Sequence, residues 1–396
     1  MEGKTSLPNC NNISVLIFGA GGRQTLPMCR GFYKLGCRVT AYCSHRMDTG
    51  YMTRFKHKKI LFDENNPYGE DFYEFGARLI KSGDYDLVVP MGDKTAMFLS
   101  QNKEELSKYA KAAVNDWDSF SKVIDKSKTM LICEENGIPA PRTLFSDDPV
   151  TEIREKGLSY PVVVKPKTGV GSIGFNIVKD EEKLKKLLEG YDNSNGPLLV
   201  QEYIEQGDQP QYGAEFFRDR DGVIRSKLIF KKPRWFPLDG GSTVCAVSVH
   251  DDEILDSCTR LLDALNWEGT ANFDLVWDEK EKKAKILEIN PRVSAIVKLS
   301  FVVGIDVARL MVENAMGYPV TDMTEYEDNK QISCLLVDCL WLAKSKDRFR
   351  SKPSWFARWR IKDTIFSWDD PIPTIGFLYE SFTGYRSAMS KRKRVE

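Results

Sequence analysis

The stretch Asn272–Arg292, NFDLVWDEKEKKAKILEINPR, constrains the fold of this 396-residue chain more than any other segment. Two apolar strands flank a charged turn near Glu281, which is the pattern of an antiparallel hairpin. If the hairpin is symmetric about that turn, Asp274 lies opposite Glu288. Residues two apart on a strand share a face, so Asn290 points the same way as Glu288. The hairpin therefore gathers two carboxylates and an amide on one patch.

Carboxylates that face each other repel, and a hard cation between them removes the repulsion. Three oxygen-bearing side chains suit Mg²⁺, with Mn²⁺ as a substitute, and Mg²⁺ usually also binds waters and phosphates. Arg292 stands beside this patch, where its guanidinium could bind phosphate or carboxylate oxygens. The alternative is an ordinary surface hairpin with a solvated acidic face. The apolar residues on both sides of Glu288 make a fully solvated face harder to accept, and at this point both interpretations stay open.

A second motif joins a strand ending in a lysine to a glycine-rich loop. The strand 160–166 carries Lys165 near its end, and the loop leads into another strand, Phe175–Val178. Alternating glycines let backbone N–H groups approach a phosphate closely, and the lysine adds positive charge. No helix and no G-K-[ST] follow, so this is not a Walker P-loop. The alternative is a flexible hairpin turn with an exposed lysine.

The strand Pro197–Gln201 runs directly into Glu202, Tyr203 and Ile204. A strand edge can bind adenine through its backbone groups, and Glu202 could accept a hydrogen bond from an exocyclic amine. The alternative is a plain exit from strand to turn.

The N-terminal part alternates short apolar strands with helices, including a helix predicted over Tyr68–Lys81. Such alternation indicates a parallel sheet, so we expect a doubly wound α/β domain over residues 1–115. The glycine turn Gly19–Arg23 lacks the third glycine of a dinucleotide fingerprint and is a weak signal for NAD. The predicted strands are Ile13–Phe18, Cys37–Tyr42 and Asp86–Pro90.

The pattern of predicted elements changes over residues 116–325. A helix is predicted at Ser119–Asn136, and most later elements are predicted to be strands. Helices are predicted again at Glu181–Leu188 and Asp252–Leu265. Many strands with few helices suggest antiparallel α+β layers.

The remaining segment, 326–396, forms a basic extension that contains several tryptophans. From residue 344 onward, thirteen Lys and Arg stand against six Asp and Glu, a local charge of +7. The apolar residues between Trp355 and Phe366 have roughly the spacing of one helix face. Such a face could lie on an anionic membrane surface, but docking on the protein's own body is the more common outcome.

Composition excludes several classes of protein. Lys and Arg number 57 and so do Asp and Glu, so a net charge of zero predicts no nucleic-acid partner. No apolar run reaches the roughly 18–20 residues of a membrane-spanning helix, and no secretory signal is visible at the start. Nine cysteines without a CxxC pair and only three histidines argue against disulfides and zinc. We therefore expect a protein of the reducing cytoplasm.

The motifs are ambiguous singly, but their order is specific. Asp125-Lys126, VVVKP, the glycine loop, QEYIE and NFDL…LEINPR together resemble the ATP-grasp superfamily over about residues 10–320. The branch that looks most similar contains carbamoyl-phosphate synthase large chains and single-chain carboxylate–amine ligases. The resemblance implies a pre-grasp α/β domain followed by two α+β subdomains, about 116–196 and 197–325, that hold ATP between them.

The resemblance also implies roles for individual residues. Lys126 and Lys165 would bind the ATP phosphates, while Asp274, Glu288 and Asn290 would bind Mg²⁺ and Arg292 would stabilise the transferring phosphoryl group. The lid over the phosphates would contain Gly169, Gly171, Ser172 and Gly174. Adenine and ribose would be contacted by Glu202, Tyr203, Ile204 and Asp208. Candidates for the carboxylate substrate are Arg234, Gly241 and Ser242, in a segment that could equally be a basic surface loop.

The implied activity is ATP-dependent ligation of a carboxylate to an amine through an acyl phosphate, with an amino acid as a candidate substrate. Two alternatives stay open: a non-catalytic ATP-binding sensor or scaffold, and a bicarbonate-using carboxylase or carbamoyl-transfer enzyme. Homodimers are common among relatives of this kind, so self-association is a further expectation.

Overall fold

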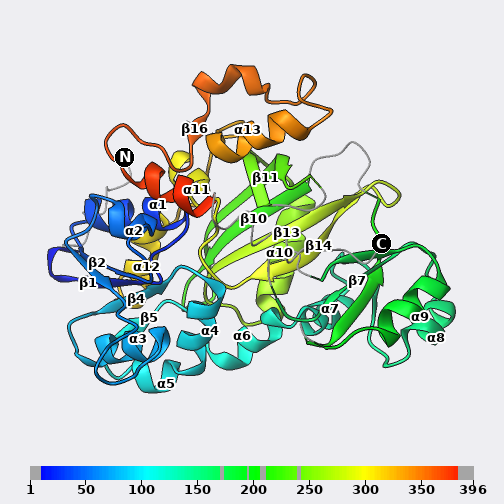
Figure 1. The fold of residues 1–396 in the computed structure, drawn as a ribbon, viewed down its shortest axis with the longest axis horizontal. Helices are drawn as coiled ribbons and strands as arrows, with labels where there is room; N and C mark the ends of the chain where they lie inside the picture. The colour runs from blue at the N-terminus through cyan, green and yellow to red at the C-terminus, as the bar shows by residue number, and fades with distance from the viewer. Residues whose placement is uncertain (1–9, 170–173, 194–195, 206–210, 239–241, 382–396) are drawn as a thin grey trace.

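The structure is a computed structural model of the chain. It describes residues 10–169, 174–193, 196–205, 211–238 and 242–381, with the side chains of 358–360 outside the described set. Three β-sheets organise these residues: a five-stranded sheet A, a four-stranded sheet B and a seven-stranded sheet C. Sheet A lies at the left of Figure 1, sheet C in the centre and sheet B, with β7, at the right.

Sheet A is parallel throughout, in the order β3-β2-β1-β4-β5. Alternate residues of its central strand supply two cores, since Ile17 packs in the cluster that holds Phe32 of α1 and Phe18 packs with Ile80 of α3. Helices thus cover both faces, and the doubly wound prediction is confirmed. After η1 (Cys10–Asn12), the elements are β1 (Ser14–Phe18), α1 (Thr25–Lys34), β2 (Arg38–Cys43), α2 (Thr49–Met52), β3 (Lys58–Leu61), α3 (Phe72–Lys81), β4 (Leu87–Pro90), α4 (Asp93–Gln101), α5 (Lys103–Leu106) and β5 (Lys111–Ala112).

Sheet B is antiparallel, in the order β6-β9-β7-β8. Val162 and Val164 of its strand β7 point into a small core with Ile153 of α8 and Leu184 of α9. The opposite face of β7 carries Lys165, because successive side chains alternate. The elements are β6 (Thr143–Leu144), α8 (Pro149–Glu155), β7 (Val162–Pro166), β8 (Asn176–Val178), α9 (Glu181–Glu189) and β9 (Leu198–Glu202).

Sheet C runs β14-β13-β10-β11-β12-β15-β16 and is antiparallel except for its last pair. Helix α10 packs on one face, where Leu261 meets Phe273 and Ile286. The other face meets α12 and sheet A through a core that includes Phe230 and Leu310. The predicted α+β layers are thereby confirmed. The elements are β10 (Gln211–Arg218), β11 (Ile224–Phe236), β12 (Ser242–Val249), α10 (Asp252–Ala264), β13 (Gly269–Asp278), β14 (Lys283–Asn290), α11 (Lys298–Val302), α12 (Val307–Ala315) and β15 (Gln331–Ser333).

The single helix predicted over Ser119–Asn136 is wrong, because two helices occupy this segment: α6 (Trp117–Ile124) and α7 (Lys126–Glu135). Asp125 separates them in an extended conformation and caps α7 by accepting from the Ser127 backbone N–H at 2.9 Å. The break places Lys126 on the first turn of the second helix.

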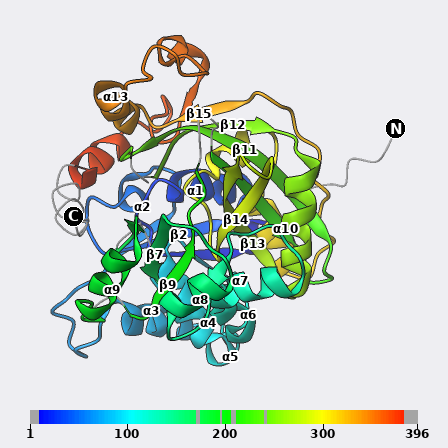
Figure 2. The same ribbon diagram turned by 90° about the vertical axis from the view of Figure 1, so that its right-hand side faces the viewer.

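The C-terminal segment adds β15 and β16 (Lys362–Asp363) to the edge of sheet C, and α13 (Leu335–Lys344) lies above that sheet in both Figure 1 and Figure 2. The expected helix face between Trp355 and Phe366 does not form, since η2 (Trp355–Arg360) is a 3₁₀ segment that gives way to β16. Ile361 and Ile365, which belonged to that face, are buried in the protein itself. We keep 1–115, 116–325 and 326–396 as a proposal for the domain boundaries.

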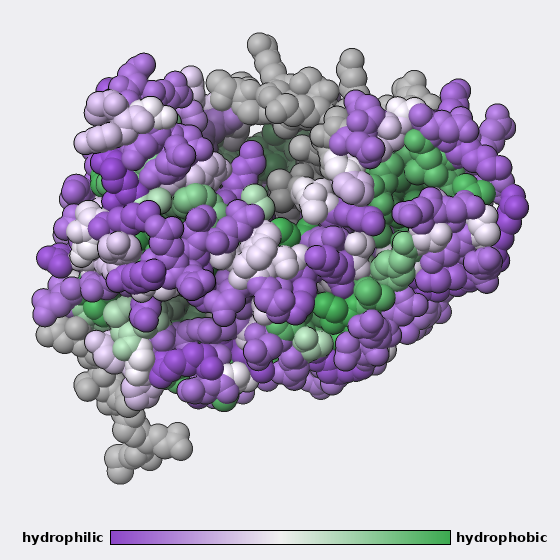
Figure 3. All heavy atoms as spheres, turned by 90° about the horizontal axis from the view of Figure 1, so that it is seen from below, coloured by the Kyte–Doolittle hydropathy of each residue, from purple (hydrophilic) through white to green (hydrophobic). Residues whose placement is uncertain are grey.

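Figure 3 shows the face seen from below, where most side chains are hydrophilic and the apolar ones form scattered groups. In the part of the chain that the structure describes, no helix combines the length and apolar character needed to cross a bilayer.

Candidate functional site

The acidic hairpin forms from β13 and β14, and Asp274 pairs with Glu288 as predicted. A β-bulge follows Asp274, because Leu275 pairs with Ile286 and one extra residue is accommodated on β14. Without the bulge, Asp274 would face Leu287, and Glu288 would point to the opposite side of the sheet. The bulge therefore brings the two carboxylates onto one face.

Asn290 completes this cluster, since its Nδ2 lies 3.2 Å from Asp274 Oδ2 and 3.5 Å from Glu288 Oε1. The amide can turn its Oδ1 toward the same point, because the two ends of the group have nearly the same shape. Two carboxylates and an amide oxygen are then available to one cation, a donor set that fits Mg²⁺. The three predicted ligands are brought together.

Lys232 belongs to this site, although the sequence did not single it out. Its Nζ bonds Asp274 Oδ1, and only 4% of the residue is exposed. Burial alone would raise the pKa of Asp274, but the Lys232 ammonium holds that pKa below its ordinary value. The alternation of side chains along β11 could have indicated this residue. Lys232 lies on the same face of the strand as Phe230, which pairs with Gly213.

Both predicted phosphate-binding lysines lie beside Glu288. Lys126 Nζ is 3.5 Å from Glu288 Oε2 and donates to the Gly169 carbonyl at 2.7 Å. Burial lowers the pKa of Lys165 to about 8, an effect that Glu288 opposes and Lys126 reinforces. The site therefore holds several positive charges around the acidic pair, as a triphosphate with a bound cation requires.

We expect the affinity of the protein for ATP to fall as the pH rises through about 8, because the Lys165 ammonium loses its proton there. Below that pH the side chain is charged and attracts phosphate. The measurement is the ATP dissociation constant between about pH 6.5 and pH 9.5. Lys165→Arg should flatten the profile, since a guanidinium stays charged throughout. A wild-type profile without a break in this range would contradict the prediction.

Arg292 reaches across to sheet A, where its Nε donates to Asp93 Oδ1 at 2.7 Å. Asp93 opens α4 directly after strand β4, at the carboxyl edge of the parallel sheet. In doubly wound sheets this edge is where ligands bind. Asp93 is a second residue that sequence reasoning missed, and it links Arg292 to the N-terminal domain.

Glu202 lies at the end of β9, with its Oε2 3.2 Å from the Arg142 backbone N–H and 3.3 Å from Lys285 Nζ. Lys285 also contacts Asp278 and Glu281, both at 2.7 Å. The three carboxylates come close enough to share a cation, but the buried Lys285 already supplies one. An ion pair thus links the predicted adenine-binding segment to the acidic hairpin, and beside Glu202 the side chain of Ile204 is buried and that of Tyr203 half-buried.

Parts of the predicted lid and substrate loop lie outside the described residues: Gly171, Ser172, Asp208 and Gly241. Gly169 and Gly174 flank the lid with φ angles of +122° and +72°, which other residues adopt only with strain. Ser242 is exposed at the start of β12. These positions stay predictions.

The structure contradicts the predicted role of Arg234 as a substrate contact. Its side chain is 0% exposed and forms two bonds to Asp338, Nε to Oδ1 at 2.8 Å and Nη2 to Oδ2 at 3.0 Å. Nη1 donates to the Pro353 carbonyl at 2.6 Å. The guanidinium joins β11 to α13 and has no free face for a ligand.

A parallel α/β sheet beside two α+β units, with lysines and an acidic hairpin between them, defines an ATP-grasp fold. Residues 123–296 match the ATP-grasp domain family, so the chain contains an ATP-grasp domain. The predicted recognition and fold are confirmed.

Relatives and solved structures agree with this assignment. The chain is 25% identical over 68% of its length to a D-aspartate ligase of Enterococcus faecium, and spans 66% of that protein. It is also 25% identical to the C-terminal section of a Methanopyrus kandleri carbamoyl phosphate synthase large chain, over 61% of this chain and 43% of the relative. The chain thus spans at most about two thirds of these relatives.

Among solved structures, N5-carboxyaminoimidazole synthetase of Staphylococcus aureus has a TM-score of 0.65 at 14% identity, covering 85% of this chain and 84% of that one. A biotin carboxylase domain from Hydrogenobacter thermophilus, solved with MgADP and bicarbonate, has the same TM-score at 15% identity, covering 80% and 73%. At these identities the similarity establishes the fold.

Proposed function

We propose that this protein is an ATP- and Mg²⁺-dependent ligase that joins a carboxylate to an amine through an acyl phosphate. The observation that carries the proposal is the convergence of Asp274, Glu288 and Asn290 beside Lys126 and Lys165. Asp274 and Glu288 are only half-buried, but facing carboxylates still repel each other, and a nucleotide-bound divalent cation between them would remove that repulsion. We also propose that the enzyme acts in the cytoplasm.

In this proposal each residue acts through its position. Asp274, Glu288 and Asn290 would hold Mg²⁺, which supplies positive charge to the phosphates when it is bound. Lys126 and Lys165 bind the phosphates, and Arg292, oriented by Asp93, stabilises charge on the phosphoryl group as it moves to the carboxylate. The amine then attacks the acyl carbon, and phosphate leaves. Water must be excluded during this interval, because an acyl phosphate hydrolyses.

We further propose that one of the two substrates is an amino acid. It rests on the similarity to a D-aspartate ligase. Among the alternatives, a carbamoyl-transfer enzyme is suggested by the carbamoyl phosphate synthase relative. A sensor or scaffold would bind nucleotide without turnover. We further propose a homodimer and no nucleic-acid partner.

The experiment is a screen for ADP release against paired libraries of carboxylates, amino acids and amines. We expect release to require one carboxylate and one amine together, since the second substrate completes each turnover. Bicarbonate with ATP alone serves as the test of the carboxylating alternative. ATP binding without ADP release in every pairing would overturn the ligase proposal in favour of a sensor.

A further inference from the structure

A small cavity lies next to the cluster of Asp274, Glu288 and Asn290, on the same face of sheet C. Glu215 of β10 pairs with Asn272, and Asn272 in turn pairs with Asn290. The cavity is bordered by Glu215, Asn272, Arg292 and Ser300 and has a volume of about 20 Å³. That space accommodates one group of the size of water, ammonia or an amino group.

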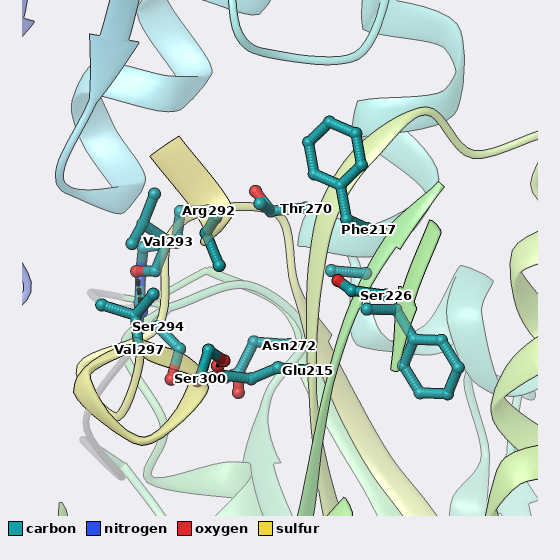
Figure 4. Close-up of a pocket in the computed structure, with 13 residues that line it drawn as sticks. Glu215, Phe217, Ser226, Thr270, Asn272, Arg292, Val293, Ser294, Val297 and Ser300 are labelled. Atoms are coloured by element: carbon teal, nitrogen blue, oxygen red, sulfur yellow. Dashed lines mark hydrogen bonds between the residues drawn. The ribbon is translucent and has the colours of Figure 1, made fainter. Parts of the chain in front are cut away.

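Glu215 is the unusual member of this lining. Only 8% of the residue is exposed. Its Oε2 accepts from Ser300 Oγ at 2.5 Å, whereas its Oε1 has no hydrogen-bond partner in the described part of the chain. In Figure 4, Glu215, Asn272 and Ser300 lie together at one end of the cavity. A buried carboxylate oxygen without a donor is unfavourable, so the site is suited to a ligand that donates hydrogen bonds.

The surroundings of Glu215 suit it to accept a proton from a basic ligand. Burial raises the pKa of Glu215, although Ser300, Ser294 and the positive charge of Lys232 act in the opposite direction. A carboxylate with a raised pKa is a better proton acceptor than an ordinary one.

A larger cavity adjoins the small one. It has a volume of about 300 Å³ and shares Phe217 and Thr270 with the small cavity. Figure 4 places these two residues at the end away from Glu215. Basic side chains outnumber acidic ones around the larger cavity, which is bordered by Lys103, Lys111, Arg220 and Glu268. A molecule that reached Glu215 through it would pass from a basic entrance to an acidic end.

We propose that this pair of cavities is the binding site of the amine substrate, an amino acid whose amino group lies against Glu215 Oε1 and whose anionic part lies in the larger, basic cavity. The inference rests on the proposed ligase function. An ammonium group bound there gives one proton to Glu215. The nitrogen then forms a bond to the acyl carbon as the bond from that carbon to the phosphate oxygen breaks, and the departing phosphate takes the second proton. An amide, inorganic phosphate and one proton released from Glu215 complete the balance.

The test separates the two half-reactions in Glu215→Gln. Formation of the acyl phosphate is followed without amine, as the exchange of ¹⁸O between the bridging and non-bridging positions of the ATP β-phosphate in the presence of the carboxylate. Amide formation is followed with both substrates. We expect isotope exchange at the wild-type rate and a fall of about 100-fold in kcat/KM for the amine. Unchanged kcat/KM for the amine in Glu215→Gln would overturn the inference.

A second variant tests the passage between the cavities without touching the acidic group. Thr270→Leu narrows this passage. We expect a larger loss of kcat/KM for amino acids than for methylamine. Equal losses for both would overturn the route through the larger cavity. If the wild-type protein shows no carboxylate-dependent isotope exchange, the ligase proposal itself fails. If exchange occurs but Glu215→Gln leaves kcat/KM for the amine unchanged, only the inference about Glu215 fails.

Discussion

Replacing Glu288 by glutamine will reduce ATP turnover by at least about 100-fold, while the protein remains folded. Glu288 faces Asp274 across the hairpin and lies near Lys126, so it stands between a proposed Mg²⁺ ligand and a proposed phosphate-binding lysine. Glutamine keeps the shape and one oxygen donor but removes the negative charge that would hold Mg²⁺. The measurement is the rate of ADP release with the best substrate pair, at saturating ATP and Mg²⁺.

A matched control exists on the same hairpin. Glu279 is a partly exposed residue of the turn, where it contacts Trp277 and Lys282, so Glu279→Gln changes the charge equally without touching the site. We expect this variant to turn over ATP at the wild-type rate. Comparable losses in both variants would mean that the hairpin contributes through folding alone. Full activity in Glu288→Gln would remove the basis of the proposed metal site.

The sequence predicted the acidic hairpin well because its information is local. The alternation of side chains and the position of the turn place Asp274 and Glu288 on facing strands. The predicted pairing of Asp274 with Glu288 was nevertheless right for an incomplete reason, because it assumed a hairpin symmetric about the turn. The turn itself pairs Asp278 with Lys283, and it is the bulge after Asp274 that restores the facing carboxylates. A bulge is a property of the assembled sheet, so symmetry about the turn alone could not predict it.

The missed residues depend on distant segments of the chain. Lys232 is 42 positions from Asp274, and Asp93 is 199 positions from Arg292. Neither stands in a motif, because each acquires its partner only when separate elements pack together. A lysine in a basic run and an aspartate after a strand are also frequent at protein surfaces. Sequence patterns therefore brought forward the proposed metal ligands, and missed Lys232 and Asp93, which pair with Asp274 and Arg292.

Arg234 was misread for a related reason. The run KKPRW looks like an exposed basic loop, but it lies in the long strand β11, where alternate residues point inward. The buried partner Asp338 is 104 positions away, in a segment treated as a separate extension. The role of Arg234 is therefore to anchor that segment to sheet C.

This role leads to a large expected effect on stability. Asp338→Ala removes the carboxylate that pairs with Arg234 and that also accepts from Ser333 Oγ at 2.6 Å. A fully buried guanidinium then lacks its counter-charge, and we expect a loss of about 3–5 kcal/mol in the free energy of unfolding. Denaturant titration followed by tryptophan fluorescence measures it, since Trp341 of α13 lies against the Arg234 guanidinium at 5.3 Å.

The double variant Arg234→Met with Asp338→Leu distinguishes a structural ion pair from a substrate contact. Removing both charges leaves no buried charge without its counter-charge, so this protein should be more stable than Asp338→Ala, because apolar side chains can replace a buried pair. Its KM for the carboxylate should equal the wild-type value, since Arg234 has no exposed face. The exposed pair Arg154–Glu181 provides the control, and Glu181→Gln should leave stability nearly unchanged. A double variant that is stable but has a strongly raised KM would return Arg234 to the substrate site.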